Sequence, residues 1–320
     1  YHRGIELNLN NACNLRCKYC FTNSPKGDHV KDFLPIPKLK EIADEADELG
    51  YIEWDLQGGE VLLRPDKLFD ALDAIQPERF YLYVTTNGYK VDRKIIKELG
   101  KRGVSRMSVS FDSWDPKFHD EMRGRKDSWK RAIQALEYIQ EAGMDPYMNV
   151  TVGHYNAKSE DLRMLLDYSK QKRYRTLVNV ACPTGMWNQV HDVVCDEEDQ
   201  KHIRQLRKEY KNLNRNLWNP FDPKLEKIMG CTTVNRMYIT ALGDVLACPY
   251  VHIKIGNVFE NTLKEISDYG FRIKHFRNYS EKCLAGEDLN FIKKFNSTPG
   301  KTIFNPVKAE EIFQKEDFVD

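Results

Sequence analysis

Short apolar runs alternate with longer amphipathic stretches over roughly the first 185 residues of the chain. Runs of about four to eight residues rich in β-branched and aromatic side chains predict strands, and apolar positions spaced three and four apart predict helices. The predicted strands are Ile5–Asn10, Tyr51–Gln57, Phe80–Thr86, Arg106–Asp112, Tyr147–Val152 and Leu177–Cys182. The predicted helices between them are Pro37–Leu49, Pro65–Ile75, Asp92–Leu99, Ser128–Ala142 and Glu160–Lys170.

This alternation is typical of βα units arranged around a parallel sheet. Several predicted helices end just before a glycine, at Gly50, Gly103 and Gly143, which is the residue that helix C-termini favour. The pattern predicts an α/β fold class, a partial (β/α)6 barrel of the TIM type. Ligands of such barrels bind at the carboxyl ends of the strands, so the residues directly after each strand are the first candidates for a site.

The pattern changes after Pro183-Thr184-Gly185, where a polar stretch rich in Asn, Lys and Arg predicts a helical linker. Beyond it, Arg236–Ala241 and Val245–Cys248 flank Leu242-Gly243-Asp244, which predicts a β-hairpin at the start of a second, small domain. The predicted organisation is a barrel over residues 1–185, a helical linker over 186–228, a small domain over 229–290 and a C-terminal tail over 291–320, extended and then briefly helical.

Charge and composition narrow the class of partner. Lys and Arg total 49 against 48 Asp and Glu, a formal charge of +1, so binding to nucleic acid or to an anionic membrane is not expected. The chain has no apolar run long enough to span a bilayer and its first residues do not resemble a signal peptide, so we expect a cytoplasmic protein. Its eight cysteines are then expected to be reduced thiols that bind metal or do chemistry, not disulfides.

Three cysteines follow the first predicted strand with the spacing C-x3-C-x2-C, at Cys13, Cys17 and Cys20. Soft thiolates this close together select an iron–sulfur cluster or zinc. A structural zinc site needs a fourth ligand, which His2 or His29 could supply. In an iron–sulfur cluster the missing ligand would instead leave one iron open for a substrate or cofactor.

This loop, with Phe21 after the third cysteine, resembles the defining motif of the radical S-adenosylmethionine (radical SAM) superfamily. The resemblance implies that Cys13, Cys17 and Cys20 hold a 4Fe-4S cluster and that S-adenosylmethionine chelates the fourth iron through its amino and carboxylate groups. Reductive cleavage would release methionine and a 5′-deoxyadenosyl radical. The resemblance also implies an electron donor such as flavodoxin or ferredoxin.

Further segments at predicted strand ends fit the same family. The resemblance implies that these segments contact S-adenosylmethionine. Without the resemblance, each segment also has an ordinary structural explanation, such as a turn, a helix cap, a solvated arginine or a polar side chain that faces the core. The cofactor-binding residues implied are Gly58, Gly59 and Glu60 after the second strand, Ser110 and Asp112 at the end of the fourth, Arg123 beyond it, and Asn149 and Thr151 on the fifth.

A second group of cysteines spans the predicted hairpin. Cys231 and Cys248 form C-x11-G-x4-C around Gly243, and Cys283 follows. This resembles the SPASM and shortened twitch extensions of the superfamily, but the later C-x2-C-x5-C-x3-C run of a full SPASM domain is missing. We therefore expect one auxiliary 4Fe-4S cluster at most, on Cys231, Cys248 and Cys283, with a fourth ligand that is Cys195, another side chain, substrate or nothing. A zinc site or buried free thiols is the alternative.

Cys182 ends the sixth predicted strand, on the active-site side of a barrel. A buried free cysteine is commonly an apolar filler. The catalytic alternative makes Cys182 a hydrogen-atom donor to a substrate radical, as in radical epimerases, a role for which Cys195 competes.

No acid–base pair stands out, so the difficult step belongs to the cofactor. With no leader-recognition module of about 80 residues before Cys13, and one auxiliary cluster, the chain resembles radical dehydrogenases and epimerases, and we expect a small, carbohydrate-like substrate, with Trp187 near its pocket. Two other functions stay open. One is a radical SAM peptide maturase; the other is a zinc-stabilised, non-catalytic binding module.

Overall fold

The computed structural model describes residues 3–24, 33–222, 224–298 and 300–319. In this part of the chain the strands form one sheet in the order β11-β10-β9-β8-β1-β2-β3-β4-β5-β6-β7. The strands are β1 Arg3–Asn8, β2 Tyr51–Gln57, β3 Tyr81–Thr86, β4 Val104–Ser110, β5 Asp145–Val152, β6 Arg175–Val180, β7 Leu213–Asn214, β8 Arg236–Ile239, β9 Asp244–Cys248, β10 Val251–Asn257 and β11 Val307–Lys308.

Helices follow the strands of the first half and become shorter in the second. Their bounds are α1 Ile36–Glu48, α2 Pro65–Ile75, α3 Arg93–Lys101, α4 Pro116–Arg123, α5 Ser128–Glu141, α6 Glu160–Lys172, α7 Glu197–Glu209, α8 Leu263–Arg272, α9 Lys274–Arg277, α10 Leu289–Phe291 and α11 Ala309–Ile312. None of the described helices has the length and apolar character needed to cross a bilayer.

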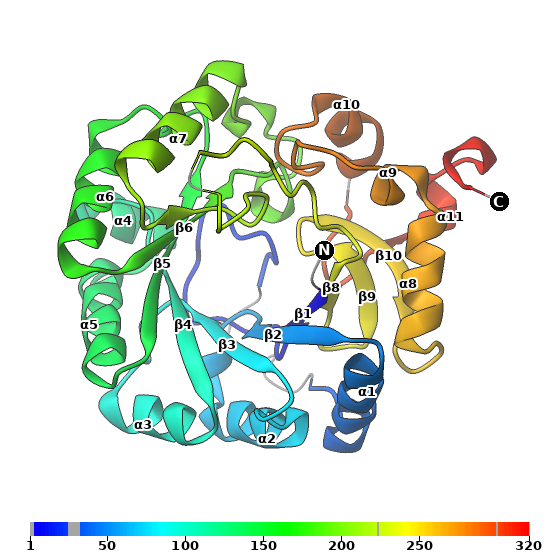
Figure 1. Cartoon of the computed structure of the whole chain (residues 1–320), viewed down its shortest axis with the longest axis horizontal. Helices are drawn as coiled ribbons and strands as arrows, with labels where there is room; N and C mark the ends of the chain where they lie inside the picture. Colours follow the sequence, from blue (N-terminus) through cyan, green and yellow to red (C-terminus); the bar gives the residue numbers. More distant parts are fainter. Residues whose placement is uncertain (1–2, 25–32, 223, 299, 320) are drawn as a thin grey trace.

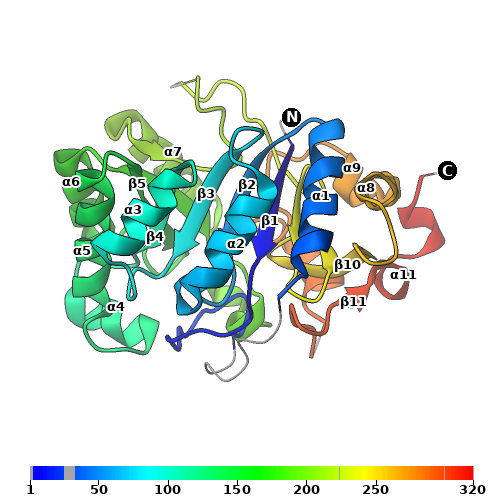
Figure 2. The same ribbon diagram turned by 90° about the horizontal axis from the view of Figure 1, so that it is seen from below.

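Strands β1 to β7 all pair in parallel, and α1, α2, α3, α5 and α6 lie outside the curved sheet (Figure 1). The predicted α/β class and partial barrel are therefore confirmed. Seen from below, the carboxyl ends of these strands face the edge where α4 and the loop after β1 lie (Figure 2). The site predicted at strand ends is expected at this edge.

The two faces of the barrel strands differ in polarity. Ile5 and Leu7 of β1 are buried in the apolar core, whereas Glu6 lies between them and lines a cavity on the other face. In β2, Leu56 is likewise buried in the apolar core and Gln57 lines a cavity. Successive side chains of a strand point to opposite faces, so the barrel packs apolar residues under its helices and polar residues inside.

The predicted elements agree closely with the structure. Strand β2 and helix α2 have the predicted bounds, and the other predicted barrel strands and helices differ by one or two residues at an end. Strand β5 begins two residues earlier than predicted because Pro146, normally a poor strand residue, pairs in register with Met107. The glycines after α1, α3 and α5 have positive φ values of 74° to 78°, which is the backbone conformation expected of a glycine that ends a helix.

The elements that were not predicted are α4 and β7 in the first part of the chain and β10, β11, α8, α9 and α10 in the second. Helix α4 buries only His119 and Arg123, so it carries no apolar stripe that sequence periodicity could reveal. Strand β7 is two residues long and adds an edge to the sheet within the stretch predicted as a helical linker, which otherwise contains α7.

The predicted hairpin is present and is joined to the barrel. Strands β8 and β9 pair antiparallel, with Gly243 in the turn at a φ of 87°, a conformation that favours glycine. Strand β8 also pairs in parallel with β1, from Gly4 opposite Arg236 to Leu7 opposite Ile239. The second region therefore continues the barrel sheet, while the four predicted domain boundaries stay a prediction.

A buried ion pair ties the end of the linker to the C-terminal part. Arg215, just after β7, donates two hydrogen bonds to the Glu287 carboxylate, at 2.8 and 2.6 Å. Both side chains are buried, and Glu287 also accepts a hydrogen bond from the Cys283 backbone N–H at 2.7 Å. Breaking a buried pair by removing one partner leaves an uncompensated charge.

We expect Glu287→Ala to lower the free energy of unfolding by about 3–5 kcal/mol, because Arg215 would stay buried without its carboxylate. Urea unfolding at neutral pH, followed by circular dichroism, measures the change. Glu141→Ala is the control, since Glu141 pairs with Arg93 at the exposed surface, where ion pairs contribute little. Equal stability of the two variants would contradict a stabilising role for the buried pair.

Candidate functional site

The loop that carries Cys13, Cys17 and Cys20 lies against the end of β2. Gly59 N–H donates to the Asn10 carbonyl and Glu60 N–H donates to the Ala12 carbonyl, both at 2.8 Å. These bonds extend the contact between β1 and β2 beyond the ends of the two strands. The first cysteine of the motif is thereby fixed beside the carboxyl end of the sheet.

Glycine is required at this contact because the two backbones almost touch. A Cβ atom on Gly58 would lie 2.5 Å from the Asn10 carbonyl oxygen, and one on Gly59 would lie 2.1 Å from the Ala12 carbonyl oxygen. Neither backbone atom can move without displacing the loop. The Gly-Gly pair thus has a structural role in addition to the cofactor contact that the resemblance implies.

Glu60 is occupied by local hydrogen bonds. Its carboxylate accepts from Thr86 Oγ1 and the Asn87 backbone N–H, both at 2.7 Å, and from the Leu62 N–H at 3.0 Å. Burial raises the pKa of Glu60, and these hydrogen bonds oppose that rise. The side chain ties the end of β2 to the end of β3, so its contribution to a bound ligand would come from the backbone.

The C-terminal turn of α4 holds the other side of the cysteine loop. Arg16 N–H donates to the Arg123 carbonyl at 3.0 Å, and Lys18 N–H donates to the Met122 carbonyl at 2.9 Å. Gly124 has a φ of 63°, and a Cβ there would lie 2.3 Å from the Arg16 carbonyl oxygen. An element without a sequence signal thus forms half of the support for the loop.

Arg123 is buried and not solvated. Its Nε and Nη2 lie 2.6 and 3.0 Å from the two oxygens of Asp112, and its Nη1 lies 3.8 Å from Cys17 Sγ. Tyr19 donates its hydroxyl to Asp112 as well. The ion pair with Asp112 therefore holds the Arg123 guanidinium group next to Cys17.

The three thiols do not have the spacing of a zinc site. In the described part of the chain, the one group of three or more His, Cys, Asp or Glu whose ligand atoms all lie within 4.8 Å is His154, Asp196 and Asp199. Zinc–sulfur bonds of about 2.3 Å in a tetrahedron would bring the sulfurs closer than this, whereas a cluster of several irons spans a wider set. The other zinc ligands considered, His2 and His29, lie outside the described residues.

Burial raises the pKa of Cys13 to about 12 and that of Cys17 to about 11. Both groups are therefore neutral thiols near pH 7 when no metal is bound. Metal binding requires thiolates, so it would release these protons and offset the cost of burying the charges.

A cavity of about 790 Å³, counted with its open mouth, adjoins the three cysteines. Of the residues implied to bind S-adenosylmethionine, those that line it are Gly58, Gly59, Glu60, Ser110, Arg123, Asn149 and Thr151. Asp112 does not line it, since its carboxylate is held by Arg123 and Tyr19. Trp187 does not line it either and packs on Tyr19 at 5.3 Å between ring centroids.

Some lining residues were not among the predicted cofactor-binding residues. Gln57, Asn87 and Asn179 lie at or near strand ends, so the rule on strand ends includes them but does not distinguish them from turn residues. Tyr250 comes from the second region and reaches the cavity because β8 pairs with β1. Such a contact between distant segments cannot be read from local pattern.

A second cavity of about 560 Å³ lies next to the first, and Asn179 and Tyr250 line both. Its wall contains Cys231, Cys248 and Cys283, which the sequence assigned to one auxiliary cluster. Cys182, at the end of β6, lines the same cavity.

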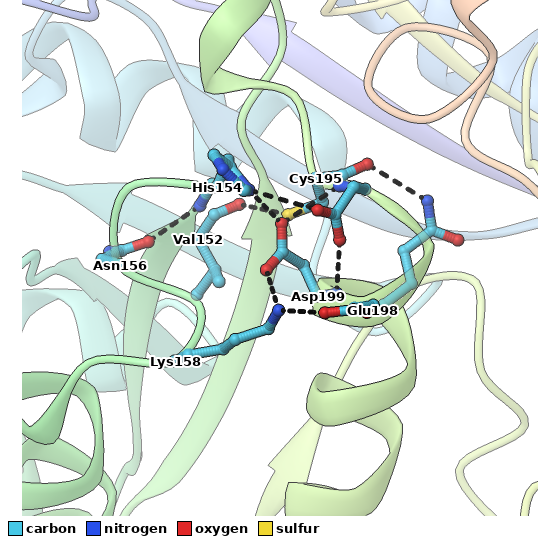
Figure 3. A network of polar contacts seen from close by, with 10 residues as sticks. Val152, His154, Asn156, Lys158, Cys195, Glu198 and Asp199 are labelled. Atoms are coloured by element: carbon cyan, nitrogen blue, oxygen red, sulfur yellow. Dashed lines mark hydrogen bonds and ion pairs between the residues drawn. The ribbon is translucent and has the colours of Figure 1, made fainter.

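Cys195 lines neither cavity. Its thiol lies 3.6 Å from the Val152 carbonyl oxygen, beside a network at the start of α7 (Figure 3). There, His154 Nδ1 lies 2.7 Å from Asp199, and Lys158 Nζ lies 3.4 Å from the other oxygen of Asp199. Asp196 and Asp199 form the capping box of α7, so this group of His154 and two carboxylates is a helix cap with an ammonium already paired to it.

We expect the network to make stability depend on pH. The hydrogen bond that protonated His154 donates to Asp199 raises the pKa of His154 above 6.5, so the stabilising effect of this bond is complete below about pH 6.5 and is lost as pH rises through the higher, folded-state value. The difference in urea midpoint between the native protein and His154→Gln should therefore be larger at about pH 6 than at about pH 9. His202→Gln, on α7 outside the network, is the control; an equal difference at both values would contradict the prediction.

We expect Gly59→Ala to displace the cysteine loop, because its Cβ would overlap the Ala12 carbonyl oxygen. The variant should stay folded by circular dichroism and lose the iron that Cys13, Cys17 and Cys20 are predicted to bind. Gly100→Ala is the matched control, since the nearest atom to its added Cβ is the flexible end of Met144 at 3.9 Å. Full iron content in Gly59→Ala would refute the close contact.

Comparison with known proteins agrees with this geometry. The model of the Radical SAM superfamily matches residues 7–168, half of the chain, and the model of the SPASM iron–sulfur cluster-binding domain matches residues 231–285. An AdoMet-dependent heme synthase of Methanosarcina barkeri is 26% identical over 88% of this chain and 87% of its own length. A GTP 3′,8-cyclase of Yersinia pestis is 29% identical, but the match spans about half of each protein, 52% and 51%.

Solved structures share the fold. Streptococcus suis SuiB has a TM-score of 0.65 at 19% identity, with 98% of this chain and 77% of that chain covered. The enzyme anSMEcpe with bound AdoMet has a TM-score of 0.65 at 16% identity, with 95% and 93% covered. The matched families use 4Fe-4S clusters and S-adenosylmethionine, which are therefore the cofactors of this protein. The chain belongs to the radical SAM superfamily and carries a SPASM-type iron–sulfur domain after its barrel.

Proposed function

We propose that Cys13, Cys17 and Cys20 bind the radical-generating 4Fe-4S cluster of this enzyme. Cys231, Cys248 and Cys283 are proposed as ligands of one auxiliary 4Fe-4S cluster. The substrate is proposed to be a neutral, hydrogen-bonding molecule whose C–H bond lies between the two cavities. The observation that carries this substrate class is that every charged side chain lining either cavity, cysteines aside, already has a partner.

The residues present suit the cofactors. Three buried or half-buried thiols offer soft ligands, and the backbone of Gly58 and Gly59 leaves no side chain at the edge of the adjoining cavity. When bound, the cluster and S-adenosylmethionine together supply a 5′-deoxyadenosyl radical able to abstract hydrogen from an unactivated carbon. The tasks left to the protein are to hold, orient and shield the reacting groups.

The charges of the cavity walls are paired within the protein. Glu6 accepts hydrogen bonds from Gln57 at 2.6 Å and from Arg236 at 3.2 Å. Arg123 is paired with Asp112, and Arg215 with Glu287. A phosphate or carboxylate on the substrate would have to compete with these bonds, because no arginine or lysine of the two linings lacks a carboxylate partner. This disfavours a nucleoside triphosphate, the substrate named for the partial relatives.

Amide and hydroxyl groups remain for recognition. Asn149, Thr151 and Asn179 lie at the ends of β5 and β6, and Asn179 Nδ2 donates to Asn149 Oδ1. Tyr250 adds an aromatic face from the second region. Such a lining matches a carbohydrate-like molecule that undergoes epimerisation or dehydrogenation, our first candidate, with a flavodoxin or ferredoxin of the cytoplasm as electron donor.

A peptide substrate is the second candidate. Among the solved structures of the same fold, SuiB is bound to the precursor peptide SuiA and anSMEcpe to the Cp18Cys peptide. A peptide backbone is also neutral and rich in hydrogen-bonding groups, so the paired charges are compatible with it.

Iron and sulfide content of anaerobically reconstituted protein tests the cluster assignment. We expect about eight irons per chain, falling to about four when Cys13, Cys17 and Cys20 are replaced together by alanine. Electron paramagnetic resonance identifies the remaining cluster. About four irons falling to none would contradict the auxiliary cluster.

Release of 5′-deoxyadenosine tests the substrate class. We expect neutral polyols or glycosides to raise it above the level without substrate, and their phosphorylated analogues not to. Asn179→Leu should lower turnover by about 10- to 100-fold through loss of about 1–3 kcal/mol of hydrogen bonding, with SAM cleavage in the absence of substrate retained. Stimulation by peptides alone would favour the second candidate, and stimulation by the phosphorylated analogues alone would contradict both.

A further inference from the structure

Four cysteines, not three, face the auxiliary cavity. Cys231, Cys248 and Cys283 belong to the second region, while Cys182 comes from the end of β6 in the barrel. Cys182 is buried, with 6% of its surface exposed, and its thiol donates to the Val180 carbonyl at 3.3 Å.

The backbone brings these thiols together from separate segments. Cys248 is the last residue of β9, and Val234 N–H donates to the Ala247 carbonyl at 2.8 Å, which fixes the segment after Cys231 beside that strand. Cys231 N–H donates to the Ser280 carbonyl at 2.8 Å, which places it near the Cys283 turn.

The turn after Cys283 closes over Cys182. Gly286 N–H donates to the Cys283 carbonyl at 3.3 Å. A Cβ on Gly286 would lie 3.0 Å from Cys182 Sγ and 2.6 Å from a methyl group of Val180, so glycine is needed for this approach. The end of β6 and the Cys283 turn are therefore packed directly on each other.

The other roles considered for Cys182 fit this placement poorly. An apolar filler would face apolar groups alone, whereas Cys182 lies at the edge of the apolar core and also lines a cavity with three thiols and with Arg215. A hydrogen-atom donor needs a thiol that is free to face the substrate, whereas the Cys182 thiol donates to the Val180 carbonyl at 3.3 Å and lines the cavity of the three auxiliary cysteines. Cys195, the other fourth ligand considered, lines neither cavity.

We propose that Cys182 is the fourth ligand of the auxiliary cluster. This inference rests on the proposed auxiliary site, and it adds a ligand from the barrel to the three of the second region. Four thiolates ligate all four irons of a 4Fe-4S cluster, so that cluster has no open position for substrate. A ligating sulfur carries no proton, so an epimerisation by this enzyme would require a hydrogen donor other than Cys182.

The auxiliary cluster can be isolated for the test. In a protein with Cys13, Cys17 and Cys20 replaced by alanine, only the auxiliary cluster should remain, at about four irons. Adding Cys182→Ser should reduce this to about three irons or fewer, and oxidation should give the paramagnetic resonance of a three-iron cluster. Adding Cys195→Ser, the matched control, should leave iron content and spectrum unchanged.

The results separate the two hypotheses. If the parent triple variant binds no iron, the proposed auxiliary site fails and this inference fails with it. If the parent holds four irons and Cys182→Ser changes neither their number nor their spectrum, only the assignment of Cys182 is overturned.

A folding defect is distinguished by a second substitution. Cys182→Asp keeps a ligating group at the same position, so it should retain about four irons with a shifted resonance spectrum. Circular dichroism of each variant confirms that the sheet is intact. An unshifted spectrum in Cys182→Asp would overturn the assignment independently of Cys182→Ser.

Discussion

A close approach of two backbones, between the end of β2 and the loop after β1, holds the loop of Cys13, Cys17 and Cys20 in place. Two hydrogen bonds of 2.8 Å join Gly59 to Asn10 and Glu60 to Ala12, and neither Gly58 nor Gly59 has room for a side chain. Glu60 then fastens the same point to β3. The position of three cysteines thus depends on main-chain contacts that tolerate almost no displacement.

A second constraint is electrostatic. The inside of the barrel contains buried carboxylates and guanidinium groups, and each has partners within the protein: Glu6 pairs with Arg236 and Arg123 with Asp112, while Glu60 accepts hydrogen bonds from neutral groups. Unpaired charges would be costly when buried, and these partners leave amides, hydroxyls and the ring of Tyr250 among the groups that can recognise a ligand.

Much of this was accessible from the sequence, for physical reasons. Parallel strands buried under helices have strong periodicity, and glycines at helix ends have a defined backbone role, so the barrel was predicted almost to the residue. The cysteine motifs were found because ligand spacing is local. Helix α4 was missed because its buried residues are His119 and Arg123, and Tyr250 was missed because its contact with the barrel depends on the pairing of β8 with β1. Cys182 could be placed on a strand end, but its neighbours from the second region were not predictable from local pattern.

The pairing of β8 with β1 has a mechanical consequence. The segments that carry Cys231 and Cys248 are continuous with the barrel through a ladder of main-chain hydrogen bonds, not connected through a hinge. A ladder of this kind resists shear and rotation, so strands β8 and β9 keep their place beside β1. Any widening that admits a substrate must therefore come from the loops and side chains at the cavity mouth, not from a movement of the second region as a body.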